Sequence, residues 1–271
     1  MAKTAELSFT RVDELAHAAR QGAAMEALPS ALAARGLGPL LEAMRFSEDG
    51  LLPPVDTINL ANFADLVHVL RGTSRAWVSR ESGRQGFLRL GSAYTDAEDT
   101  NWTGFGLKLQ QALEREGLAH AIAGQILGAT KELHSNIYEH SEKPRTGLVA
   151  FAVHDRSFEF VVTDRGRGVL DSLRTNPAHA NLASHGEAIR LALQTGVSRH
   201  AGDPLRGMGF DRMLTGLANL NCALRFRSGD GAVTLDPGSR HGMRPVVRQR
   251  PPLQGFFVSV QFTSPVPRTV I

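Results

Sequence analysis

The sequence predicts an α/β protein in which helices pack on a β-sheet, and three observations support this prediction. Apolar residues at three- and four-residue steps predict one long amphipathic helix over residues 118–140. Two apolar runs follow at residues 147–153 and 158–163, and the short polar segment between them is typical of a hairpin turn. A second predicted hairpin and a last apolar strand close the sequence, so strands and helices share this part of the chain.

The N-terminal part of the chain is also α/β in character, but no motif identifies its fold. Residues 12–44 are rich in Ala and Leu, which favour helix, and the segment is interrupted near Pro29 and at residues 36–38. The elements expected next are a linker at residues 51–54, a strand at 55–60, a helix at 63–70, and strand-like pieces at 76–79 and 87–90. We expect a smaller N-terminal α/β region over residues 1–112.

A second domain is expected over residues 113–271. Residues 106–116 have helical spacing, and the polar stretch before them, 96–104, is expected to be a loop. The later elements are helices at 186–194 and 210–220, a hairpin with strands at 223–226 and 232–235, and a last strand at 256–262. The arginine-rich segment 236–252 is interpreted as a solvated or partner-facing loop in preference to a nucleic-acid contact.

Composition indicates a protein without membrane segments in a reducing compartment. With 271 residues, 42% of them hydrophobic, the chain can bury a sizeable core, and its formal net charge of +3 does not by itself imply a nucleic-acid partner. The single cysteine, Cys222, excludes an internal disulfide framework and a multi-cysteine metal site. No apolar run approaches the roughly 20 residues of a spanning helix, and no signal-peptide stretch opens the sequence. We therefore expect a cytoplasmic protein with no membrane partner.

The predicted long helix carries three polar residues on one side. Glu132, Asn136 and His140 lie four residues apart, so their side chains project together, beside the apolar stripe. An acid, an amide and an imidazole aligned next to a buried face are unusual on a purely structural helix. A solvated polar face is the alternative interpretation.

A glycine-containing turn follows the strand at residues 158–163. Asp164 ends the strand, and Gly166 and Gly168 allow the backbone to turn tightly and to approach a ligand closely. A carboxylate only accepts hydrogen bonds, so Asp164 at the floor of a pocket can select an exocyclic amine such as that of adenine. By itself, however, Asp-x-Gly-x-Gly is also common in turns that bind no ligand.

A third motif opens a predicted helix. Its residues are Arg206, Gly207, Met208, Gly209 and Phe210. Glycines at a helix N-terminus present free N–H groups and the positive end of the helix dipole, which favour phosphate. The same pattern also occurs where a helix simply packs closely.

The order and spacing of these motifs resemble the nucleotide-binding domain of the GHKL (histidine-kinase-like) superfamily, which includes gyrase B subunits, mismatch-repair ATPases, sensor histidine kinases and anti-sigma-factor serine kinases. Asn136 with His140, and the Gly-Met-Gly-Phe of residues 207–210, are most similar to the anti-sigma-factor kinases. The resemblance covers residues 118–263 and implies a two-layer α/β sandwich of the Bergerat type. Residues 113–271 are therefore expected to form a histidine-kinase-like ATP-binding domain, and the expected cofactors are ATP and Mg²⁺.

The resemblance also implies residue roles. Asn136 would coordinate Mg²⁺, Glu132 would act as general base, and Asp164 would bind the adenine amine. The other positions implied to contact the nucleotide are His140, Gly166, Gly168, Arg206, Gly207, Met208, Gly209 and Phe210, under a lid formed by residues 169–206. One departure from the family pattern is Phe256, which follows Gly255 where the closing strand usually begins Gly-Thr.

Two functions stay open. Glu132 favours an enzyme, an ATPase or a serine/threonine kinase of a regulatory protein partner, because binding alone needs no base. The alternative is a nucleotide-sensing module that docks a protein partner with negligible turnover. A third interpretation is that the three motifs serve packing alone and resemble a nucleotide site by coincidence. It would have to explain three motifs in the family's order at once. A homodimer is an open alternative.

Overall fold

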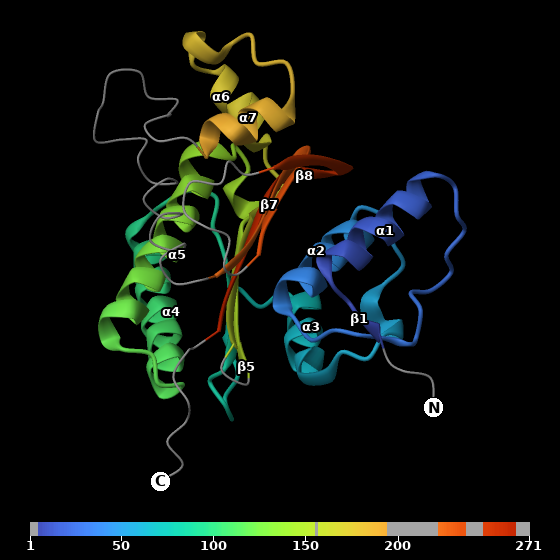
Figure 1. Cartoon of the computed structure of the whole chain (residues 1–271). Coiled ribbons are helices and arrows are strands. Elements are labelled where there is room, and N and C mark those ends of the chain that lie inside the picture. Colours follow the sequence, from blue (N-terminus) through green and yellow to red (C-terminus); the bar gives the residue numbers. More distant parts are fainter. Residues whose placement is uncertain (1–4, 155–156, 194–221, 237–245, 264–271) are drawn as a thin grey trace. The chain divides into compact units, whose positions relative to one another are not determined.

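A computed structural model describes residues 5–154, 157–193, 222–236 and 246–263 of the 271-residue chain (Figure 1). The chain divides into two compact units, Met1–Ser74 and Arg75–Ile271. Both units combine helices with a sheet, which confirms the prediction of an α/β protein. Within the described ranges, no helix is long and apolar enough to cross a membrane.

The first unit combines helices with a short parallel strand pair. Its main elements are β1 (Ala5–Glu6), α1 (Phe9–Arg20), β2 (Leu32–Ala33), α2 (Leu37–Glu48) and α3 (Ala64–Arg71). The expected strand at residues 55–60 is wrong, since Val55–Thr57 forms a 3-10 turn. Pro54 before it has no N–H to donate to a ladder, and Asn59 forms only an isolated bridge with Ala33.

The second unit is built on an antiparallel sheet with six strands in the described part of the chain, in the order β3-β4-β5-β6-β8-β7. The strands are β3 (Ala76–Val78), β4 (Gln85–Arg89), β5 (Leu148–His154), β6 (Ser157–Asp164), β7 (Ala223–Leu235) and β8 (Val247–Thr263). β5 and β6 confirm the predicted pair of apolar strands, with Leu148 opposite Thr163. Because β6 lies between β5 and β8, Asp164 at its end lies in the middle of the sheet, opposite Phe256.

β7 is one long strand, and the hairpin expected over residues 223–235 is wrong. Its pairing with β8 shifts register between Ser228 and Gly231, as in a β-bulge. Gly229 has a φ of +55°, and a Cβ there would lie 2.3 Å from the ring of His185. Gly229 therefore makes room for this ring, and Gly231 for the side chain of Ile189, within a continuous strand.

Helices α4 (Asp96–Arg115) and α5 (His120–His140) lie side by side on one face of this sheet (Figure 1). α5 confirms the predicted long helix, whereas residues 96–104, expected to be a loop, begin α4. Thr95 caps α4 by accepting a hydrogen bond from the N–H of Glu98 at 3.4 Å, and acidic residues in the first turn favour the positive end of the dipole. The core between helices and sheet includes Trp102, Phe105, Leu109, Leu133, Ile137, Phe151, Phe160 and Val258.

The second unit begins earlier than expected. β3 and β4 extend the sheet from β5, and α4 packs in the same core. Residues 75–112 therefore belong with the sheet, and the boundary expected at residue 113 moves to Arg75. These residues carry no recognisable motif because their contribution is pairing and packing.

Helices α6 (Gly168–Arg174) and α7 (His185–Ala192) follow β6 and contact β7 and β8. α7 confirms the helix expected at residues 186–194. The two helices share a small apolar cluster formed by Leu170, Leu173 and Ala188. They make up the described part of the segment that the family resemblance implies to be a lid.

Candidate functional site

Helix α5 carries Glu132 and Asn136 beside its buried face. Leu133 and Ile137 are buried in the core, whereas Glu132 is exposed and Asn136 is half-buried. Among the residues that the structure describes, neither Glu132 nor Asn136 has a hydrogen-bond or ion-pair partner for its side chain. The amide of Asn136 is partly exposed to solvent and has no protein partner in the described ranges, so it is accessible to a ligand.

The carboxylate of Glu132 has a raised pKa. Desolvation of this carboxylate is the larger cause, although the residue as a whole is exposed. Repulsion by the carboxylate of Glu139 is the second cause. A higher pKa makes a carboxylate a better proton acceptor, as long as it stays ionised, and this suits a general base.

Asp164 ends β6 and is buried, with 2% of its surface exposed. Its Oδ1 accepts a hydrogen bond from the N–H of Gly166 at 2.6 Å, so the carboxylate itself shapes the turn that follows. The hydroxyl of Thr163 donates to the carbonyl of Phe256 at 2.8 Å, which ties the end of β6 to β8. The acid is thus held at a defined point in the middle of the sheet.

The turn after Asp164 is bound to the C-terminal end of α5. The N–H of Arg167 donates to the carbonyl of Ser141 at 3.1 Å, and its Nε donates to the carbonyl of His140 at 2.8 Å. The guanidinium of Arg167 also pairs with Glu142 at 2.7 Å. The structure therefore brings two of the predicted motifs together, the polar helix and the Asp-x-Gly-x-Gly turn.

Both glycines of the turn are required by packing inside the protein. A Cβ at Gly166 would lie 2.1 Å from the carbonyl oxygen of Ser141. Gly168 has a φ of +76°, and a Cβ there would lie 2.7 Å from Oγ of Ser228, which accepts a hydrogen bond from the N–H of Val169. The two glycines therefore allow close approach of Ser141, at the end of α5, and of Ser228, in β7. The motif alone had suggested close approach of a ligand.

The third motif lies outside the described residues, as does the lid from residue 194 to 206. The role in phosphate binding therefore stays a prediction for Arg206, Gly207, Met208, Gly209 and Phe210. His140, by contrast, is half-buried in the last turn of α5, where its backbone carbonyl accepts the hydrogen bond from Arg167.

Sequence reasoning misses Arg167, because the residue occupies a variable position between two motif glycines. Its partners His140 and Glu142 are 27 and 25 residues away along the chain, so no local pattern connects them. The same holds for Ser228, which reaches the start of α6 from the far edge strand. The only available signal is the unusual pair of arginines inside a glycine turn.

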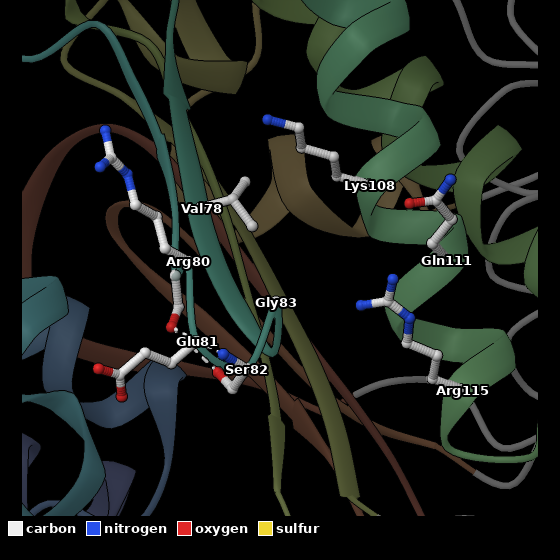
Figure 2. A pocket seen from close by; sticks show the side chains of 9 residues that line it. Val78, Arg80, Glu81, Ser82, Gly83, Lys108, Gln111 and Arg115 are labelled. Carbon is white, nitrogen blue, oxygen red and sulfur yellow. Dashed lines mark hydrogen bonds between the residues drawn. The ribbon is translucent and has the colours of Figure 1, made fainter.

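A surface hollow lies elsewhere, between the β3–β4 turn and α4 (Figure 2). Lys108, Gln111 and Arg115 line it from α4, and Val78 and Gly83 line it from the other side. Its volume of about 240 Å³ is below the roughly 300–1,000 Å³ of pockets for drug-sized ligands. None of the predicted site residues lines this hollow, so it is separate from the candidate site.

The fold and the site define a class: an α/β protein in which a central strand ends in a buried acid, next to a helix with free polar side chains. Comparison of the chain with protein-family models and with curated proteins finds no match. In the described ranges, no group of three or more His, Cys, Asp or Glu side chains could hold a metal ion. A magnesium ion here would take the amide oxygen of Asn136 together with phosphate oxygens, a ligand set that suits this hard cation.

Proposed function

We propose that this protein binds Mg²⁺-ATP in the manner of the GHKL superfamily, on a Bergerat-type sandwich formed by the second unit. We further propose that it hydrolyses ATP or phosphorylates a regulatory protein partner. The observation that supports the proposal is the contact between the turn of Asp164 and the end of α5. This contact fixes the turn that follows Asp164 to the end of the helix that carries Glu132 and Asn136.

Each side chain has chemistry suited to its proposed task. Asp164, an acceptor only, would take a hydrogen bond from the exocyclic amine of adenine. The amide oxygen of Asn136 would hold the magnesium ion, which when bound neutralises charge on the phosphates. Glu132, with its raised pKa, would accept the proton of the attacking water or hydroxyl.

The test of the binding site is Asp164→Asn. Asparagine keeps the volume and the acceptor for the N–H of Gly166, but it removes the charge. Losing a charge-assisted hydrogen bond should cost about 1.5–3 kcal/mol, or one to two decades of ATP affinity in calorimetry. Asp65→Asn, at an exposed position of α3 in the first unit, is the matched control and should bind as wild type does.

Wild-type ATP affinity in a folded Asp164→Asn variant would rule out the adenine assignment. Equal affinity of the wild type for ATP and GTP would do the same, because guanine lacks the 6-amino group. Binding without turnover of Mg²⁺-ATP, even with a protein partner present, would select the nucleotide-sensing module in place of the enzyme.

A further inference from the structure

We propose that Arg167 is the positioning residue of the nucleotide site. It sets the distance between the adenine end, at Asp164, and the phosphate end, at Asn136, without itself touching the nucleotide. The inference rests on the proposed function, and it identifies the residue that makes one site out of two separate motifs.

Three hydrogen bonds connect Arg167 to the end of α5 and the residues directly after it. Its backbone N–H and its Nε bond the carbonyls of Ser141 and His140, and its side chain is only 15% exposed. The last carbonyls of a helix have no partner within the helix and carry the negative end of its dipole, so a guanidinium is well placed there. One residue thus fastens the end of the helix to the turn.

The ion pair with Glu142 is the weaker part of this contact. The side chain of Glu142 is 65% exposed, and exposed ion pairs contribute little because water screens them. Glu142 also has a φ of +61°, a left-handed conformation in which the chain leaves the helix axis directly after α5. The carbonyl contacts therefore hold the position, and Glu142 orients the guanidinium.

Positioning matters because ATP has to be bound at both ends at once. If the end of α5 moves relative to the turn, the adenine can still bind at Asp164, but the phosphates no longer meet Asn136. In catalysis, a displacement of about 1 Å can lower the rate up to a hundredfold, and we expect the affinity for a ligand held at both ends to depend on distance in the same direction. Adenosine, which has no phosphates, reports on the adenine end alone.

The experiment compares Arg167→Met with Arg145→Met in the full chain. Arg145 is exposed in the 3-10 turn Pro144–Thr146 and has no partner among the described residues, so this variant matches the change of charge and volume. Arg167→Met should weaken ATP binding about tenfold or more while adenosine affinity changes less than twofold. Hydrogen exchange of the amides at 137–141 should become faster with no nucleotide present. Arg167→Lys, which keeps the charge and one donor, should show a smaller effect in the same direction.

The outcomes separate the positioning role from the proposed function. Faster exchange together with a selective loss of ATP affinity supports the role. Equal losses for ATP and adenosine would place Arg167 at the adenine end only, and unchanged exchange and affinity would make it a surface residue; either result overturns the inference. If the wild type binds no ATP at all, the proposed function fails, whereas a change in exchange would still report the contact between turn and helix.

Discussion

Glu132 and Glu139 are two acids on α5 whose charges affect one another. Glu139 raises the pKa of Glu132, second to the desolvation of that carboxylate. Neither side chain has a partner in the part of the chain that the structure describes, so both negative charges are uncompensated. An acid kept free on an otherwise well-packed helix is better explained by a chemical task than by stability, since its removal would relieve repulsion.

Replacing Glu132 by Gln should therefore separate binding from chemistry. ATP affinity should stay equal or improve, because a negative charge near the triphosphate is removed. Turnover or phosphotransfer should fall about a hundred- to ten-thousand-fold, the usual contribution of a general base. Calorimetry and a phosphate-release assay measure the two quantities, and an unchanged rate would leave Glu132 as a solvated surface residue.

Glu139→Gln is the matched variant, and its effect has a definite sign. Without the neighbouring negative charge, the pKa of Glu132 should be lower, so the base stays ionised down to a lower pH. The acid limb of the pH–rate profile should move toward lower pH, with little change in the maximal rate. An acid limb that does not move would mean that a different group titrates.

At the scale of elements, the packing of α4 on α5 encloses a histidine. The ring of His134 is fully buried and lies 4.5 Å from Trp102 and 5.3 Å from Tyr138, measured between ring centroids. Within the described residues, neither ring nitrogen has a hydrogen-bond partner. Desolvation lowers the pKa of His134 to about 3; the positive charge of Lys131 acts in the same direction, and Asp99 opposes it.

This histidine should make the protein less stable in acid. Its folded pKa of about 3 is below the ordinary histidine value of 6.5, so between these two pH values the unfolded chain binds more protons, and the free energy of unfolding falls as pH falls. His134→Phe keeps a ring in the cluster and removes the titration. Between about pH 8 and pH 5 the wild type should lose roughly 2 kcal/mol more than the variant in denaturant unfolding. If the free energies of unfolding of the wild type and the variant fall in parallel as pH falls, the imidazole of His134 has a hydrogen-bond partner in the folded protein and its pKa is not lowered.

The elements that periodicity defines were the predictable ones. α5 and the strands β5 and β6 follow from apolar spacing alone, because each buries one continuous apolar face. The start of α4 did not follow, since the many polar residues at 96–104 hide its helical spacing. A cap and the helix dipole stabilise this first part of α4, and Trp102 is its contribution to the core. β8 begins at Val247, inside the expected loop 236–252, because pairing with β7 overrides its polar composition.

The candidate site was predictable only as separate pieces. Glu132, Asn136 and Asp164 are identified by residue type and spacing, and their positions on a helix flank and at a strand end agree with the structure. The contact that joins them depends on backbone carbonyls at the end of α5 and on Arg167. Every residue has a backbone carbonyl, so no sequence pattern predicts which carbonyls Arg167 will contact.

For the whole molecule, the boundary at Arg75 has a direct consequence. A fragment of residues 75–271 keeps all described strands of the large sheet together with α4, and should unfold cooperatively and bind nucleotide as the full chain does. A fragment of residues 113–271 loses β3, β4 and most of α4, so it exposes the apolar face that Trp102, Phe105 and Leu109 cover. It should aggregate or lack dispersed amide resonances in NMR. If both fragments are equally stable, the domain boundary lies at residue 113, as the sequence predicts, and not at Arg75.

The close fit at Gly166 and Gly255 bears on how this protein can diverge over evolution. Gly255 has a φ of +76°, and a Cβ there would lie 2.2 Å from the carbonyl oxygen of Asp164, much as a Cβ at Gly166 would collide with Ser141. Selection for folding alone would therefore keep glycine at both positions, whether or not the proposed nucleotide binding is retained. Among distant relatives, the identity of the side chains at positions 132 and 136 would be the more informative marker of the proposed activity.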